Sequence, residues 1–271
     1  MSWLDYGFIR HGVAACVFAG VSCSLIGVPI VVMDLAFLGV CMSHAALAGA
    51  VVGLYFGFSP TIGAYVGCGL TAILIGPVAD RTRLGSGSAM GVIFAALLGV
   101  TFLLMGLLEG PKTSALSILW GSLLTVGVTD LMVMAMVTAV VIAAAVLFVP
   151  YLRALMLGRE LADALGAPAT ATYYGVIVLC GLTTACFLSG IGGLLLFCLV
   201  LTPAASAYQF TYRLGVMMIV APLIGIAAAL GGLFVSCLLN WPTGATIILM
   251  ACVVFAVSTL FSTKRGHKSH T

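Results

Sequence analysis

One histidine, His44, lies inside a long apolar stretch and is the residue with the clearest potential for chemistry. The stretch 35–56, LAFLGVCMSHAALAGAVVGLYF, is long enough to cross a bilayer as a helix, and His44 is its tenth residue. At helical rise His44 therefore lies about 15 Å from the start, near the middle of a hydrocarbon core about 30 Å thick. An ionisable group at that depth is costly unless it faces protein or water. The position indicates either a transport pathway or a hydrogen-bonded packing residue.

Two sulfur-containing residues precede the histidine. Cys41 comes three residues earlier, so the two side chains can share one helix face, whereas Met42 is two residues away and points elsewhere. Imidazole and sulfur ligands favour Zn(II) or Cu(I) over Mn(II). Cys41 is therefore either a second metal ligand or a small packing residue.

Small residues recur every four positions in the same stretch, on one stripe of the predicted helix. Such a stripe lets another helix backbone come close, and His44 is adjacent to it, so we expect the imidazole to point into a bundle rather than at lipid. The residues of this stripe are Cys41, Ala45, Gly49, Gly53 and Gly57.

The composition is that of a membrane protein. Of 271 residues, 63% are hydrophobic and 6% are charged, against about 25% charged in soluble domains. The basic residues are scattered between apolar runs, so the net charge of +3 gives no indication of nucleic-acid binding. We expect one all-α polytopic domain over 1–271, a bundle of about eight or nine transmembrane helices, with no soluble domain attached.

Apolar runs that are interrupted by polar residues, glycine or proline predict nine membrane spans. Their approximate ranges are 12–32, 35–56, 60–79, 88–108, 129–150, 171–190, 193–208, 214–238 and 243–262. The seventh contains Pro203 and is expected to be kinked or broken. A further short apolar segment, Ser114–Val126, is typical of a re-entrant or interfacial piece.

The distribution of Lys and Arg gives the orientation. An external N-terminus places eight of the ten basic residues in the cytoplasm and leaves only Arg10 and Lys112 outside. The positive-inside rule therefore favours this orientation.

The longest cytoplasmic connection is then 151–170, YLRALMLGRELADALGAPAT. Within it, the portion from Arg159 to Leu165 predicts a short amphipathic helix that ends at Gly166 and is followed by Pro168. Apolar residues presented to the cytoplasm suggest a docking element, and the alternative is a solvated connector.

Several enzyme classes lack their signatures here. The sequence contains no HExxH, GxSxG or GxxxxGK[ST] motif and no paired carboxylates inside the spans. The chain is therefore not expected to be an enzyme or to bind ATP, and any motor must be a separate subunit. Transport fits best, and a membrane scaffold or sensor without an ATPase partner is the alternative from another class.

Four stretches together resemble the zinc, manganese and iron class of ABC permeases, the ABC-3 metal permease family. LAFLGVCMSHAALAGAVVG is similar to a family signature in which an AFFGD-type run leads into Ser-His-Ala. GRELADALGAPA resembles the cytoplasmic coupling segment, SGIGGLLLFCLVLTPAASA the Gly-rich turn and proline-containing helix, and NWPTGATIIL the final helix entry. The resemblance extends over essentially the whole chain.

This resemblance implies the ABC importer permease fold in a bacterial or archaeal inner membrane. It implies a pathway between two copies of the chain, a cytoplasmic ABC ATPase dimer that binds ATP, and an extracytoplasmic solute-binding protein. The cargo would be a transition metal, with zinc first and manganese or iron next, and no cofactor resides in this chain. The implied ATPase-coupling residues are Gly158, Arg159, Glu160, Leu161, Ala162, Asp163, Leu165 and Gly166.

The sequence departs from the family at the metal site. The family commonly has an Asp four residues before the histidine, where this chain has Val40, and many relatives have an acidic residue where it has Asn240. Only His44 carries over as a ligand, with Cys41 as a softer candidate beside it. A metal chelate, a soft metal such as copper, or a small uncharged solute is therefore the alternative cargo on the same fold.

Overall fold

The structure is a computed structural model, and every helix of the part that it describes is long and apolar enough to cross a membrane. It describes residues 7–82, 86–108, 121, 123, 126–155, 162, 166 and 168–262. Nine helices span these residues, and no strand occurs among them. They are α1 Gly7–Val32, α2 Leu38–Phe56, α3 Pro60–Thr82, α4 Ser86–Leu107, α6 Val128–Leu155, α8 Ala169–Ile191, α9 Gly193–Phe210, α10 Leu214–Leu239 and α11 Thr243–Leu260.

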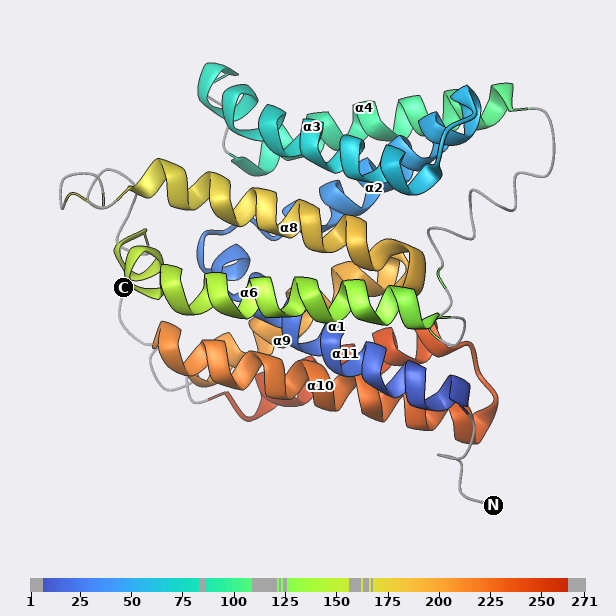
Figure 1. Ribbon diagram of the computed structural model, residues 1–271. Helices are drawn as coiled ribbons and strands as arrows, with labels where there is room; N and C mark the ends of the chain where they lie inside the picture. The colour runs from blue at the N-terminus through green and yellow to red at the C-terminus, as the bar shows by residue number, and fades with distance from the viewer. Residues whose placement is uncertain are drawn as a thin grey trace.

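The helices form an antiparallel bundle in which successive spans return to the opposite side. Because the described helices number nine, α1 begins and α11 ends at opposite ends of the bundle (Figure 1). The all-helical membrane fold predicted from the apolar runs is confirmed, and all nine predicted spans correspond to helices.

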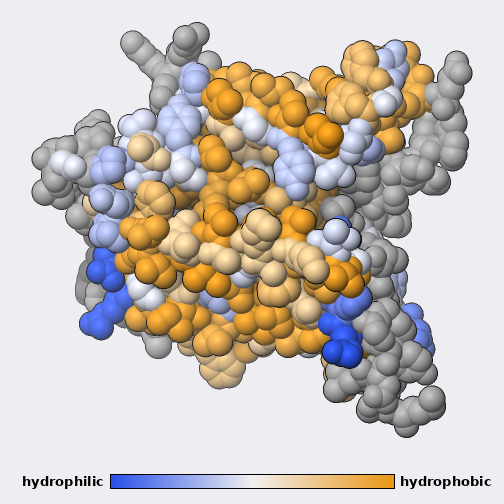
Figure 2. Space-filling model, viewed as in Figure 1, coloured by the Kyte–Doolittle hydropathy of each residue, from blue (hydrophilic) through white to orange (hydrophobic). Residues whose placement is uncertain are grey.

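The bundle is layered, with α2, α3 and α4 at one side, α10 and α11 at the other, and the remaining helices between them (Figure 1). The helices α1 and α2 are mostly buried, whereas α4, α6 and α11 direct most side chains outward. The outer faces are therefore apolar, as Figure 2 shows for one side of the molecule. Water cannot solvate such a surface, and lipid or another protein must cover it.

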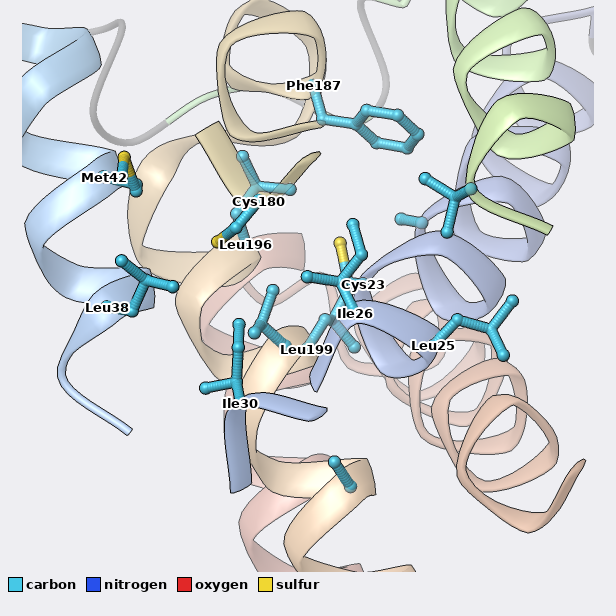
Figure 3. Packing of buried hydrophobic residues seen from close by; sticks show 14 of the residues in the cluster. Cys23, Leu25, Ile26, Ile30, Leu38, Met42, Cys180, Phe187, Leu196 and Leu199 are labelled. Carbon is cyan, nitrogen blue, oxygen red and sulfur yellow. The ribbon is translucent and has the colours of Figure 1, made fainter. Parts of the chain in front are cut away.

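The core lies where α1, α2, α8 and α9 meet. Fully buried side chains from these helices converge there, among them Ile30, Leu38, Met42, Phe187 and Leu196 (Figure 3). Burial of these groups in one cluster fixes α2 against the centre of the bundle and so positions His44.

Glycines allow backbone contact at the helix crossings. Gly49 of α2 lies against the carbonyl oxygen of Gly63 on α3, and Gly20 of α1 lies against the backbone of α10 at Gly225. Ala45 of α2 contacts α3 in the same way, through its own carbonyl oxygen and Gly67. The close approach predicted from the small-residue stripe therefore occurs, and its partner is α3.

Several helix bounds differ from the prediction. The second helix begins at Leu38 rather than at Leu35, because the chain turns at Asp34, whose φ is +55°. The fifth span, α6, continues past Pro150 to Leu155, so the following connection is shorter than expected. The seventh, α9, continues through Pro203 as one helix to Phe210.

Two carboxylates, Asp34 and Asp130, lie at helix ends. Asp130 is in the first turn of α6, where its Oδ2 accepts a hydrogen bond from the Gly127 N–H at 3.1 Å. Asp34 is exposed in the turn before α2. A carboxylate at a helix start is favourable because it satisfies an unpaired backbone N–H.

Candidate metal-pathway site on the second helix

His44 lies in the first half of α2, on the side facing α4. It is six residues after Leu38, about 9 Å from the start of the helix at 1.5 Å per residue, rather than the predicted 15 Å. Its side chain is half-buried in the isolated chain. The imidazole is therefore neither sealed in the core nor fully presented to lipid.

One hydrogen bond defines which nitrogen of the ring is available. Nδ1 lies 3.0 Å from the carbonyl oxygen of Val40, one turn earlier in the helix. Because a carbonyl only accepts, Nδ1 must carry the proton, and the lone pair of a neutral ring is then on Nε2. Metal-binding histidines use this arrangement, with one nitrogen donating to a carbonyl and the other binding the ion.

The opposite wall of the site comes from α4. The ring of Phe94 meets the imidazole edge to face, with ring centroids 4.8 Å apart and an interplanar angle of 78°. Phe94 also packs edge to face on Phe37, just before α2, at 5.3 Å. These contacts restrict the rotation of His44 and hold it against α4.

Cys41 lies on the same side of α2, one turn before the histidine, and is completely buried. Its Sγ donates to the carbonyl oxygen of Met90 on α4 at 3.8 Å. Met42 points elsewhere, as predicted: its sulfur is next to Gly181 of α8. Among the residues that the structure describes, no group of three or more His, Cys, Asp or Glu forms a metal cage.

A serine that the sequence analysis overlooked anchors the site. Ser43 is buried, and its Oγ lies 2.9 Å from the carbonyl oxygen of Gly39 and 3.2 Å from that of Gly193, the first residue of α9. A bond between neighbouring helices contributes about 1 kcal/mol inside a membrane. The residue before the histidine thus ties α2 to the α8–α9 turn at Gly192.

An open apolar groove of about 340 Å³ lies beside the site, between α2, α3 and α4. Ala48 and Val52, one and two turns after His44, line it together with Ile93 and Leu97 of α4. Residues 44, 48 and 52 share a helix face, so the histidine is on the face of α2 that continues into this groove, although it is not itself a lining residue.

The predicted coupling segment falls almost entirely outside the described residues. Of Gly158, Arg159, Glu160, Leu161, Ala162, Asp163, Leu165 and Gly166, the structure describes only Ala162 and Gly166. Ala162 is buried, and Gly166 has φ +76°, the left-handed conformation expected of a residue that ends a helix. Of the predicted segment Ser114–Val126, only Gly121, Leu123 and Val126 are described.

A bundle of nine membrane-crossing helices, with a half-buried imidazole inside one of them and an open groove beside it, defines a polytopic membrane permease. The chain belongs to the ABC 3 transport family, whose model matches residues 5–262. The family predicted from the sequence is thereby confirmed, and with it a multi-pass location in the bacterial inner membrane.

Individual relatives cover nearly the whole chain. The manganese transport system membrane protein MntC of Halalkalibacterium halodurans is 32% identical, over 97% of this chain and 90% of the relative. The chelated iron transport system membrane protein YfeD of Yersinia pestis is 23% identical, over 95% of this chain and 87% of the relative. Among solved structures, PsaBC from Streptococcus pneumoniae in complex with Fab aligns with a TM-score of 0.84 and 26% identity, over 97% of this chain and 95% of that one.

Proposed function

We propose that this chain is the permease subunit of an ATP-driven importer and that a transition metal ion passes beside His44. The observation that carries the proposal is the hydrogen bond from Nδ1 to the carbonyl of Val40, which leaves Nε2 as the metal-binding nitrogen of a half-buried ring within a membrane span. Family membership supports transport over a scaffold or sensor role.

Manganese takes the place of zinc as the first cargo to test. The relatives include several that are named as manganese transport proteins, and one is named for chelated iron. The residues of α2 argue in the other direction, because a site of His44 and Cys41 with Val40 in place of a carboxylate favours the softer Zn(II). Manganese and zinc must therefore be measured side by side.

The described residues of one chain bring at most two candidate ligands together, His44 and Cys41, so we infer that further ligands complete the site. We infer that a second copy faces α2 and α4 and that the pathway runs between the copies. The half-burial of His44 and the open groove between α2, α3 and α4 support this arrangement, because a polar ring inside a membrane needs cover from protein or water. Carbonyl oxygens and water, which Mn²⁺ prefers, would complete the coordination.

The proposal includes two kinds of partner protein, an ATPase and a solute-binding protein. A cytoplasmic ABC ATPase dimer would dock through Gly158–Gly166 and bind the ATP. An extracytoplasmic solute-binding protein would deliver the metal at the end of the bundle that carries Arg10. The gathering of basic residues at the opposite end supports this orientation.

The decisive experiment compares His44→Ala with His11→Ala. His11 lies near the start of α1, away from the α2–α4 face, so its loss controls for the removal of an imidazole as such. Uptake of Mn²⁺ and Zn²⁺ into cells is measured at equal amounts of protein in the membrane. Removal of a ligand should lower uptake of the true cargo by at least tenfold, on the order of the loss seen when even the outer shell of a metal site is changed.

Each outcome has a definite meaning. Loss of Mn²⁺ uptake alone in His44→Ala identifies manganese as the cargo, and loss of Zn²⁺ uptake alone identifies zinc. If His44→Ala takes up both ions as well as His11→Ala does, His44 has no role in the mechanism. Copurification with an ATPase chain, followed by metal-dependent ATP hydrolysis, tests the motor separately, and its failure would contradict the ATP-driven part.

A further inference from the structure

A second apolar groove, to which neither α2 nor α4 contributes a lining residue, has no role in the proposed transport pathway. It lies between α1, α6 and α8, reaches α10, and has a volume of about 190 Å³. Ile26, Phe148, Leu152, Val176 and Met218 are among the side chains that line it. Thr172 is the polar member of the lining, and its hydroxyl is already bonded to the carbonyl of Pro168 at 2.9 Å.

The groove lies toward one end of the bundle. Its lining comes from the last part of α1, the second half of α6 and the first half of α8, so it lies toward the end where α6 finishes and α10 begins. Figure 2 shows apolar residues over α6 and hydrophilic residues gathered at that same edge. In a bilayer we therefore expect lipid of the leaflet at that end to reach the groove.

Two arginines, Arg153 and Arg213, lie at the end of the groove where α6 finishes and α10 begins. Arg153 follows the lining residue Leu152 directly, and its Nη2 lies 3.3 Å from the position that a Cβ on Gly215 would occupy. Arg153 therefore lies across the first turn of α10. Arg213 immediately precedes that helix and is exposed. Among the residues that the structure describes, neither guanidinium has an ion-pair partner.

We propose that this groove binds an anionic phospholipid, with an acyl chain between α6 and α8 and the phosphate on Arg153 and Arg213. An apolar groove that ends beside two exposed guanidinium groups is complementary to a molecule with an apolar tail and a negative head. Guanidinium groups bind phosphate oxygens in pairs, and anionic lipids are attracted to basic residues at the membrane surface. A neutral lipid would fill the groove but would bring no negative charge to the two guanidinium groups.

The test uses the purified full-length chain and native mass spectrometry. Phosphatidylglycerol and phosphatidylcholine with identical acyl chains are titrated onto the protein, and the affinity of the first bound lipid is compared. The attraction per basic residue corresponds to about a fivefold gain in affinity, so two arginines predict a preference for phosphatidylglycerol of about 30-fold.

Three variants separate the head from the tail. Arg153→Gln with Arg213→Gln should abolish the preference while phosphatidylcholine still binds. Gly175→Leu should weaken both lipids, because Gly175 is a lining residue whose Cβ would meet no other atom within 4 Å, so a larger side chain can enter the groove without disturbing the helices. Arg10→Gln, at the other end of the bundle, should bind as the wild type does.

Three binding results would overturn the proposal, and so would a fourth result, obtained with the ATPase chain bound. They are equal binding of the two lipids by the wild type, an unchanged preference in the double arginine variant, and an unchanged affinity in Gly175→Leu. A copurifying ATPase chain that abolishes the preference would show that protein covers the arginines instead, and this would also overturn it. Size-exclusion profiles identify any variant that fails to fold. If the double glutamine variant fails, the double variant Arg153→Lys with Arg213→Lys replaces it. This variant keeps both positive charges and should retain most of the preference for phosphatidylglycerol.

Discussion

Replacement of Gly49 by alanine is expected to separate two helices that now touch backbone to backbone. A Cβ at this position would overlap the Gly63 carbonyl oxygen, would lie 2.7 Å from the carbonyl carbon, and would be 3.1 Å from the Cα of Gly67. Because ordinary contact begins at 3.4 Å, α2 and α3 must move apart by roughly 0.7 Å or more.

The cost of that movement follows from the dispersion contacts along the crossing. A gap of 0.5–1 Å forfeits about a quarter to a half of the attraction between facing atoms, and overpacked cores lose about 1–3 kcal/mol in stability. Gly49→Ala should therefore lower the free energy of unfolding by about 1–3 kcal/mol. The intrinsic gain of alanine over glycine in a helix, about 1 kcal/mol, offsets only part of the strain.

The matched control is Gly69→Ala on α3, the partner helix of this crossing, where an added Cβ would meet no other atom within 4 Å. This variant should be as stable as the wild type or more stable by up to about 1 kcal/mol. Thermal unfolding of the purified protein in detergent, followed by the loss of the monodisperse size-exclusion peak, ranks the three proteins. Equal midpoints for Gly49→Ala and Gly69→Ala would refute the close crossing of α2 and α3.

Three further changes have defined outcomes. Ser43→Ala removes the hydroxyl between α2 and the first carbonyl of α9 and should cost about 1 kcal/mol of stability in the same thermal assay, with no loss if the bond does not form. Asp130→Ala leaves a backbone N–H at the start of α6 without its acceptor and should lower the stability by about 0.5–2 kcal/mol. Asp130→Asn keeps an acceptor oxygen and should retain most of that stability, and thermal unfolding measures both variants. Val40→Asp places a carboxylate one turn before His44 and should shift the competition for uptake from Zn²⁺ toward Mn²⁺, because Mn²⁺ prefers oxygen ligands; an unchanged ratio of the two ions would place the ligand set elsewhere.

The architecture was predictable because hydrophobicity alone determines which segments cross a membrane. A span needs about 20 apolar residues, and this requirement appears directly in the sequence as long runs with polar breaks. The glycine stripe likewise predicted a close helix crossing. The sequence did not indicate that α3 would be the partner, because a stripe of small residues predicts a close helix contact but does not identify the second helix.

The surroundings of the histidine were less predictable. Its contact with Phe94 and the bond from Ser43 to Gly193 join residues that are 50 and 150 positions apart. No local pattern encodes such pairings. The depth of His44 was overestimated because the helix was expected to begin before the turn at Asp34, where a positive φ interrupts it.

The adjacency of Ser43 and His44 joins the candidate ligand mechanically to a distant corner of the bundle. Gly192, with φ +89° and ψ +147°, makes the sharp corner between α8 and α9, and the serine hydroxyl bonds to the residue that follows it. Neighbouring residues of one helix move together. Any tilting of α9 about that corner would therefore reach the imidazole through the peptide unit that joins Ser43 and His44, so an ion held at the ring would respond to the tilt of α9.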